Sequence, residues 1–300
     1  KSENEKQPVI VWIYGGGLTS GSANCDIYDG EELAKKGVVF VSINYRVGIL
    51  GFMAHPELSK ESGNNASGNY GFMDQIAALK WVKKNINAFG GDPNNITIAG
   101  QSAGAFSVNT LIASTLAENI FHKAILQSGG LLGSSRAQTL TEAEVTGQRF
   151  MEKAKVTTIE ELRQLPALEL QRISNNQEIG RVGITEDGYV VPKNLMAHFK
   201  NGKQQQIPII SGWVTGDGDF LGGNEMTVEK YKEEAIANYG DKAASFLALF
   251  PADTNEDVKK MKSKLGMLNF AGVPSYLRGT LRASYATYME SRLATFRQNN

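Results

Sequence analysis

The hydrophobic pattern of the first 45 residues predicts a strand, a helix and a second strand. PVIVWIY (residues 8–14) is a continuous apolar run that ends in three glycines, and VVFVSIN (residues 38–44) has a similar character. Uninterrupted β-branched and aromatic runs are typical of strands that are buried on both faces of a parallel sheet. Between the two runs, EELAKKG predicts a short helix that ends at Gly37.

The alternation of helices and strands continues along the chain. Apolar positions at spacings of three and four predict a long amphipathic helix that ends at GGDPNN. These positions are Ile76, Leu79, Val82, Ile86 and Phe89. Three further apolar runs, at residues 96–99, 123–129 and 206–212, predict the remaining strands. The predicted fold class is therefore α/β, with a mostly parallel sheet flanked by helices.

The segment of residues 131–205 has a different pattern. It is more polar, mostly helical in periodicity and without the buried-strand signature. We expect it to form a helical cap inserted over the sheet, within a single domain that covers residues 1–300. The last eighty or so residues are again largely helical in pattern. Aromatic residues within the predicted elements are expected to pack in the core. They are Trp12, Phe72, Trp81 and Phe89.

Charge and cysteine content narrow the class of partner. Basic and acidic residues both number 31, and no long run of like charge occurs. This balance argues against nucleic acid or an anionic membrane surface and favours a small-molecule partner. Cys25 is the only cysteine, which excludes an intrachain disulfide and a multi-cysteine metal site. No apolar run is long enough to span a membrane.

A serine between two glycines is the first candidate for chemistry. ITIAGQSAGAF places Ser102 in a G-x-S-x-G motif between a predicted buried strand and a helix. A sharp turn there would hold the hydroxyl out at the carboxyl end of the sheet, and the small residues would let the turn close. The motif also arises by chance, so an ordinary loop serine is the alternative. A serine hydroxyl needs a base to become a nucleophile.

Three consecutive glycines, Gly15, Gly16 and Gly17, follow the first strand. A glycine loop can aim backbone amides at the oxygen of a tetrahedral intermediate, and the amide after the nucleophile would complete the set. The alternatives are an ordinary glycine turn or a phosphate loop. The surrounding residues match neither phosphate-loop pattern, G-x-x-x-x-G-K-[ST] or G-x-G-x-x-G.

Together these blocks resemble the type-B carboxylesterase family, relatives of cholinesterases and fungal lipases within the α/β-hydrolase fold. The resemblance is carried by VIVWIYGGG, VSINYRVGILGF, GNYGFMDQIAALKWVKKNINAFGGDPNNITIAGQSAG, FHKAILQSGG and IPIISGWVTGDGDF. It covers most of residues 8–130 and then residues 206–220, and it leads us to expect a bacterial member of the family. The remaining residues resemble the family only loosely.

The resemblance implies roles for individual residues. Ser102 would be the nucleophile, and the amides of Gly16, Gly17 and Ala103 would form the oxyanion hole. The acid of the triad would be Asp217 of TGDGD, a position at which most relatives carry Glu.

Other residues that match the family would support the nucleophile and the acid. Asp219 is the second candidate for the acid, and a solvated Gly/Asp turn is the alternative for both aspartates. Gln101 stands where many relatives carry Glu, and Ser128 resembles a serine that supports the acid. Arg46 and Asp74 also match the family, and we expect them to form an internal ion pair that organises the loops. No cofactor or metal is implied.

The catalytic histidine is not evident among the three histidines of the chain. His55 lies in a loop after the second strand, His122 precedes the fourth strand, and His198 precedes the acid. In α/β-hydrolases the triad runs serine, acid, histidine, and no histidine follows Asp217. We therefore expect the histidine to lie beyond this chain, in a longer esterase, and the 300 residues alone to be nearly inactive.

The expected function is hydrolysis of a small-molecule carboxylic ester through an acyl-enzyme. A non-catalytic, cholinesterase-like recognition domain is the main alternative, and a serine hydrolase of amides or lactones is a further one. The family resemblance tilts the expected localisation toward a secreted or periplasmic protein.

Overall fold

A computed structural model describes residues 5–131, 137–214, 217 and 226–274 of the chain. Its centre is a parallel sheet of five strands in the order β2-β1-β3-β4-β7. The strands are β1 (Gln7–Ile13), β2 (Val39–Ser42), β3 (Gly91–Gln101), β4 (Lys123–Gln127) and β7 (Ile209–Gly212). The five predicted strands, their parallel pairing and the flanking helices are confirmed.

The central strands are buried, whereas the outer ones are not. Val9, Val11 and Ile13 of β1 are completely buried, as are Ile96 and Ile98 of β3. Every residue of β2 is only half-buried. The prediction that residues 38–44 are buried on both faces was wrong, because β2 pairs only with β1 in the part of the sheet that the structure describes.

β3 begins earlier than the sequence predicts. The GDPNN stretch, expected only to end the preceding helix, is extended, and Gly91 pairs with Gln7 of β1. The Gln7 amide also donates to the Gly90 carbonyl at 2.9 Å, and the register shifts between Gln7 and Val9. Pairing with β1 therefore extends the strand through a sequence that on its own favours a turn.

Two helices cover the central strands and contact each other. They are α4 (Tyr70–Asn85), which a 3-10 turn extends over residues 86–89, and α5 (Ala103–Ala113). All eleven residues of α5 are buried. The short predicted helix is α1 (Glu31–Lys35), and it packs against β2.

The expectation of aromatic core packing holds only in part. Phe72 is fully buried and Trp12 is partly buried. Trp81 and Phe89 are 53% and 55% exposed, so the core prediction was wrong for both. Their rings lie 6.1 Å apart, and each covers part of the other on the outer side of α4.

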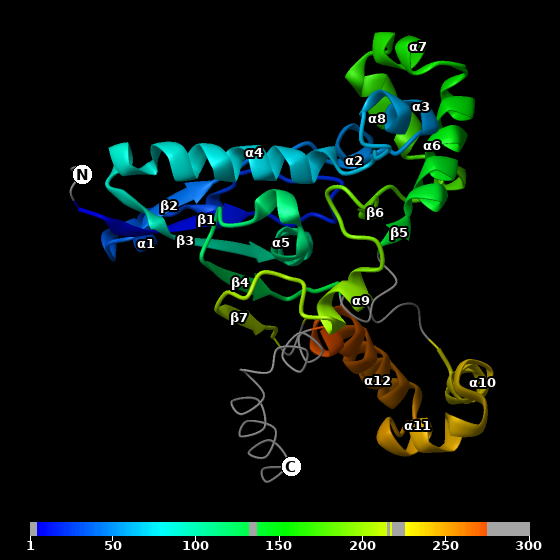
Figure 1. The fold of residues 1–300 in the computed structure, drawn as a ribbon. Coiled ribbons are helices and arrows are strands. Elements are labelled where there is room, and N and C mark those ends of the chain that lie inside the picture. Colours follow the sequence, from blue (N-terminus) through cyan, green and yellow to red (C-terminus); the bar gives the residue numbers. More distant parts are fainter. Residues whose placement is uncertain (1–4, 132–136, 215–216, 218–225, 275–300) are drawn as a thin grey trace.

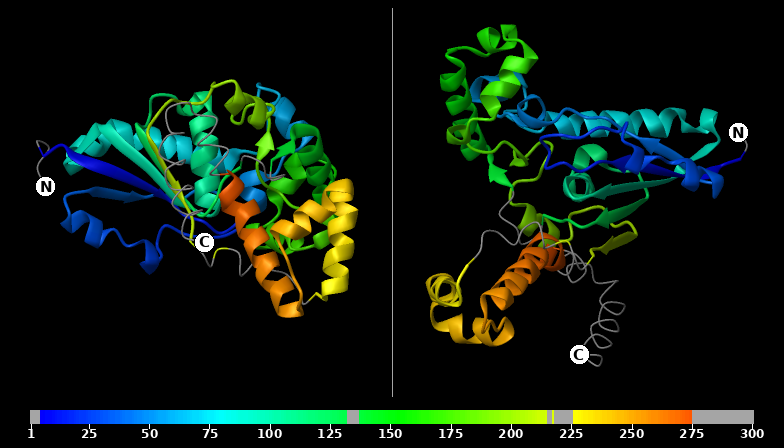
Figure 2. Two further views of the ribbon diagram at one scale, coloured as in Figure 1. Left: turned by 90° about the horizontal axis from the view of Figure 1, so that it is seen from below. Right: turned by 180° about the vertical axis from the view of Figure 1, so that it is seen from behind.

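Helices of the predicted cap segment lie beyond the ends toward which the strands point (Figures 1 and 2). They are α6 (Leu140–Ala154), α7 (Ile159–Gln164), α8 (Ala167–Ser174) and α9 (Leu195–Lys200). Two other short helices, α2 (Gly48–Phe52) and α3 (Pro56–Glu61), meet them from the sheet side. A second cluster of buried apolar residues joins the two groups. Its buried members are Ile49, Met53, Phe150, Met151, Ile159, Leu162 and Ile179.

A two-stranded parallel sheet within the same segment was not predicted. β5 (Gln138–Thr139) pairs with β6 (Thr185–Glu186). Two-residue strands are too short to show a periodic pattern, so the sequence gives no signal for them.

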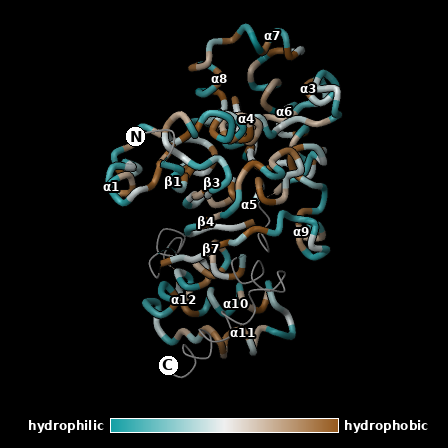
Figure 3. Tube along the Cα trace, turned by 60° about the vertical axis from the view of Figure 1, so that its left-hand side comes forward, coloured by the Kyte–Doolittle hydropathy of each residue, from teal (hydrophilic) through white to brown (hydrophobic). Residues whose placement is uncertain are grey.

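Three further helices, α10 (Val228–Tyr239), α11 (Ala243–Leu249) and α12 (Asn255–Met267), form a group with its own small apolar cluster around Tyr231 and Val258. Figure 3 contrasts the largely hydrophilic α12 with the apolar α5. Within the ranges that the structure describes, no helix is both long and apolar enough to cross a membrane.

Candidate active site

The carboxyl ends of three adjacent strands bring the predicted residues to one edge of the sheet. Ser102 follows β3, and its amide donates to the carbonyl of Gln127 at the end of β4 at 2.9 Å. Ser128 follows β4, and its amide donates to the carbonyl of Gly212 at the end of β7 at 2.8 Å. Asp217 lies five residues beyond β7. Ser102 and Ser128 therefore lie at one edge of the sheet, and Asp217 follows the strand that adjoins β4.

Ser102 has a backbone conformation that side chains rarely adopt. Its φ is 56° and its ψ is −120°, and it is the residue at which β3 turns into α5. A strained conformation of this kind costs about 1–3 kcal/mol and persists only when the surrounding structure enforces it. Ser102 is one of several described non-glycine residues with a positive φ, and it is the one predicted to carry the chemistry.

The glycines on either side of Ser102 are required by space. A Cβ added at Gly100 would lie 2.5 Å from the backbone of Gly104. One added at Gly104 would lie 2.0 Å from the carbonyl oxygen of Ile13. The turn can therefore close only with glycine at both positions, which gives the G-x-S-x-G spacing a physical reason.

The first residue of α5 presents a free amide beside Ser102. Ala103 is fully buried, and the amides of the first helical turn have no partner inside the helix. The helix dipole adds partial positive charge at the same end. An anionic oxygen at Ser102 would therefore be stabilised there.

The triple-glycine loop passes directly against the candidate nucleophile. A Cβ added at Gly15 would lie 3.1 Å from the Cβ of Ser102. Gly16 and Gly17 have φ angles of 108° and 68°, in the region that favours glycine. A Cβ at Gly16 would also lie 2.3 Å from the carbonyl oxygen of Ser20.

Hydrogen bonds fix the carbonyls of this loop and so aim its amides. The Gly16 carbonyl accepts from the amides and hydroxyls of Thr19 and Ser20, at 3.1–3.3 Å. In a planar trans peptide the N–H points opposite to the C=O, so the Gly17 amide is directed away from this turn. In the part of the chain that the structure describes, no residue accepts a hydrogen bond from the amide of Gly16 or Gly17.

Two buried tyrosines hold the start of the loop, and neither was singled out from the sequence. The Tyr45 hydroxyl donates to the Tyr14 carbonyl at 3.0 Å, and the Tyr14 hydroxyl donates to the Tyr45 carbonyl at 3.1 Å. Their rings stack 4.5 Å apart. Burial raises the pKa of both hydroxyls, so both stay neutral donors. The position of Tyr14 just before Gly15 is the only sequence signal for this pair.

The candidate acid lies in a tight turn. The Asp217 carboxylate accepts from the Val214 amide at 2.9 Å, and the Asp217 amide donates to the Val214 carbonyl at 3.2 Å. The side chain of Ser128 is buried but makes no hydrogen bond to Asp217. Gln101 is half-buried, and its amide oxygen lies against Gly15. Asp219, the second candidate, lies outside the described residues.

The predicted Arg46–Asp74 ion pair is present. The Arg46 guanidinium donates two hydrogen bonds of 2.8 Å to the Asp74 carboxylate, and the Arg46 amide adds a third at 2.9 Å. These bonds raise the pKa of Arg46. The pair is not internal, because 53% of the Arg46 side chain is exposed. It ties the residue after Tyr45 to α4.

Comparison with known proteins identifies the family. The model of a family described as "carboxylesterase family" matches residues 1–269. The chain belongs to the carboxylesterase family. Among relatives in this family, it is 39% identical to fumonisin B1 esterase of Sphingopyxis macrogoltabida, over 86% of the chain and 48% of the relative. It is 36% identical to para-nitrobenzyl esterase of Bacillus subtilis, over 70% of the chain and 44% of the relative.

Solved structures of carboxylesterases agree with the fold. The chain superposes on the Geobacillus stearothermophilus carboxylesterase with a TM-score of 0.77 and 30% identity, over 94% of the chain and 60% of that structure. For a structure titled PNB esterase the TM-score is 0.76 and the identity is 29%, over 93% of the chain and 60% of that structure. The α/β-hydrolase fold is thus confirmed. The chain spans about half the length of the curated relatives that it matches.

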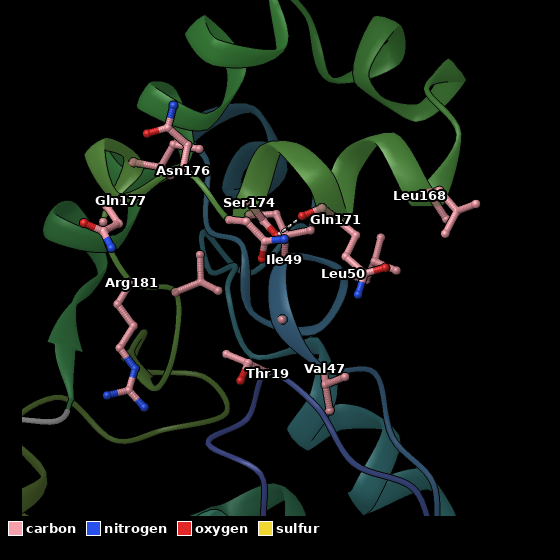
Figure 4. A pocket seen from close by; sticks show the side chains of 16 residues that line it. Thr19, Val47, Ile49, Leu50, Leu168, Gln171, Ser174, Asn176, Gln177 and Arg181 are labelled. Carbon is pink, nitrogen blue, oxygen red and sulfur yellow. Dashed lines mark hydrogen bonds between the residues drawn. The ribbon is translucent and has the colours of Figure 1, made fainter. Parts of the chain in front are cut away.

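Two cavities of this carboxylesterase-family chain adjoin the glycine loop. The smaller, of about 350 Å³, is lined by Gly17, Leu18, Phe106 and Arg181, among others. The larger, of about 620 Å³, lies between α2 and α8, and Figure 4 shows Thr19 and Val47 at one end of it. Arg181 lines both cavities, and its guanidinium donates to the Gly17 carbonyl at 3.4 Å. Sequence reasoning missed Arg181, which lies 164 residues from Gly17.

None of the three histidines contacts the candidate nucleophile of this family member. The His55 ring accepts a hydrogen bond from the Glu57 amide at the start of α3. The His122 ring accepts one from the Ile96 amide, in the middle of β3. His198 lies in α9 beside Phe199. Burial lowers the pKa of all three side chains.

His55 predicts a pH dependence of stability. Because its folded-state pKa is lowered, the unfolded chain takes up a proton first as the pH falls below about 6.5. Protonation would also remove the ring acceptor that caps α3. We expect the melting temperature to fall between pH 7.5 and pH 5, and His55→Asn to reduce that fall, because asparagine caps without titrating.

The measurement is thermal unfolding of both proteins at the two pH values. At pH 7.5 the variant serves as its own control and should melt close to the parent chain, since His55 is neutral there. An equally steep fall in the variant would show that His55 does not contribute to the acid sensitivity.

Proposed function

We propose that the protein hydrolyses carboxylic esters through an acyl-enzyme formed on Ser102. The observation that carries this proposal is the geometry of Ser102. Its strained backbone sits between Gly100 and Gly104, at the amino end of α5 and against the glycine loop. The names of the relatives, fumonisin B1 esterase and para-nitrobenzyl esterase, support the same reaction class.

In the first step the Ser102 hydroxyl oxygen attacks the ester carbonyl while a histidine takes up its proton. Negative charge then develops on the carbonyl oxygen. The amides of Gly16, Gly17 and Ala103 are the donors available for it. Collapse of the tetrahedral intermediate breaks the ester C–O bond, and the histidine returns the proton to the leaving alcohol.

In the second step water attacks the acyl group on Ser102, and the same histidine accepts its proton. We propose Asp217 as the acid that orients this histidine and stabilises its charged form. We further propose that the histidine comes from sequence beyond this chain, because His55, His122 and His198 are all engaged elsewhere. The helices of residues 131–205 would cap the site and shape its specificity.

A fluorophosphonate probe tests the proposal, because it phosphonylates an activated serine irreversibly. The intact mass of the 300-residue chain and of a protein extended to the next histidine would be followed after exposure to the probe. We expect only the extended protein to gain a single adduct, which peptide mapping places on Ser102. It should also hydrolyse 4-nitrophenyl butanoate.

Other outcomes favour different functions. If neither protein labels, a non-catalytic recognition domain becomes the better account. If the 300-residue chain labels as fast as the extended protein, a histidine within this chain is the base and its assignment beyond residue 300 is wrong. If amides or lactones turn over faster than the matched ester, the ester assignment fails.

A further inference from the structure

We propose that Arg181 binds a carboxylate of the substrate, so that the preferred esters carry a free carboxylate group. The inference rests on the proposed ester hydrolysis and adds the substrate class. It draws on three observations: the place of Arg181 beside the glycine loop, its charge in two cavities whose other described lining residues are uncharged, and the absence of a counter-charge among the described residues.

Arg181 lies close to the reacting atoms. Its guanidinium contacts the carbonyl of Gly17, and Gly15 of the same loop lies against Ser102. Gly15 and Gly17 are two peptide units apart, a span of at most roughly 7.6 Å between their Cα atoms. A group held by Arg181 would therefore lie at the same glycine loop as an ester carbonyl at Ser102.

Among the residues that the structure describes, Arg181 is the only charged side chain that lines the two cavities. Amide and hydroxyl groups of Thr19, Gln171, Asn176 and Gln177 make up much of the polar lining of the larger one. Apolar side chains of α2 and α8 line the rest. Figure 4 shows the Arg181 side chain extending away from Gln177. Arg181 also lines the smaller cavity.

The guanidinium has no counter-charge among the described residues. Three other described arginines are paired, Arg46 with Asp74, Arg163 with Glu61 and Arg172 with Glu169, whereas the exposed Arg149 on α6 is in no ion pair with a described residue. In the ranges that the structure describes, no carboxylate lies within salt-bridge distance of Arg181. Its guanidinium has one long bond, to the Gly17 carbonyl, which leaves most of its five donors free.

These features together fit a carboxylate. The planar guanidinium fork matches the two oxygens of a carboxylate, and charge-assisted hydrogen bonds of this kind are about twice as strong as neutral ones. The apolar residues on α2 and α8 offer a surface for a carbon chain. The matching ligand is an ester in which a short apolar chain separates the ester group from a carboxylate.

The experiment compares charged and neutral esters of matched length in the ester-hydrolysing protein that contains this chain. The acyl-side pair is 4-nitrophenyl hydrogen glutarate and 4-nitrophenyl pentanoate. The alcohol-side pair is 4-carboxyphenyl butanoate and phenyl butanoate. For at least one pair, Arg181→Gln should lower the ratio of kcat/KM, charged over neutral, by about 10- to 100-fold.

The loss should appear mainly in KM for the charged ester, since the carboxylate is held equally in the ground state and the transition state. Arg181→Lys should recover part of the ratio, because lysine keeps the charge but not the fork. The matched control is Arg149→Gln. Arg149 is exposed on α6 and lines neither cavity, so its substitution should leave the ratio unchanged.

Failure of this inference differs from failure of the proposed function. If the esters are hydrolysed but Arg181→Gln leaves both ratios unchanged, the carboxylate site is wrong and the esterase assignment stands. If no ester is hydrolysed, binding of glutarate measured by calorimetry decides the question. Weaker binding to Arg181→Gln than to Arg149→Gln upholds the site, and equal binding overturns it.

Discussion

Replacing Ser102 with alanine is expected to lower kcat/KM for ester hydrolysis by at least about 10⁴-fold in the protein that contains this chain. The hydroxyl is the only group at the turn that can form the acyl bond. The amides of the glycine loop and of α5 would remain in place, so the residual rate would reflect their stabilisation of charge alone. The measurement is steady-state hydrolysis of 4-nitrophenyl butanoate.

Ser114 provides a matched control at the other end of the same helix. It is 1% exposed, and its hydroxyl has no hydrogen-bond partner among the residues described. Ser114→Ala should therefore retain activity and stability, because it removes no hydrogen bond of the folded chain. Activity of Ser102→Ala near that of Ser114→Ala would place the nucleophile elsewhere.

Gly104→Ala is expected to destabilise the protein by at least about 3 kcal/mol and to abolish labelling by the fluorophosphonate. The new Cβ would lie 2.0 Å from the Ile13 carbonyl oxygen and 3.1 Å from that of Tyr14. Both atoms belong to backbone, which cannot turn aside as a side chain can. α5 would have to move away from β1, and Ser102 with it.

Chemical denaturation and labelling kinetics on the same preparation test this expectation. Gly212→Ala is the control, because an added Cβ there meets no atom of the described residues within 4 Å and its φ does not favour glycine. That variant should unfold and label like the parent. If Gly104→Ala labelled at the parental rate, the claim that this contact sets the geometry of Ser102 would fail.

Local sequence patterns predicted the parts of the fold that depend on residues close together in the sequence. The apolar runs located all five strands of the sheet, and the glycine spacing around Ser102 agrees with the close contacts of Gly100 and Gly104. Errors arose where distant pairing decides. β3 extends through GDPNN because β1 lies beside it, and the amphipathic pattern of α4 does not reveal that Trp81 is exposed.

The residues that support the candidate site could not be predicted from the sequence, for the same reason. Tyr45 contacts Tyr14, which is 31 residues away in the sequence. Arg181 contacts Gly17, which is 164 residues away. Nothing in the local sequence of either residue signals the contact. Which titratable groups surround an active-site loop is a property of the tertiary fold, and a single sequence shows only those groups that belong to a recognised motif.

Helix α8 lines the larger cavity but contributes no buried residue to the fold. It has no buried residue, yet Ala167, Leu168, Gln171 and Ser174 of this helix form one wall of the larger cavity. Leu168 is 79% exposed. Exposed positions usually tolerate substitution within about 0.5 kcal/mol. A mutant library confined to the exposed Ala167, Leu168 and Gln171 should therefore leave the sheet and the turn at Ser102 intact, and it would test whether the larger cavity selects the acyl or the alcohol group.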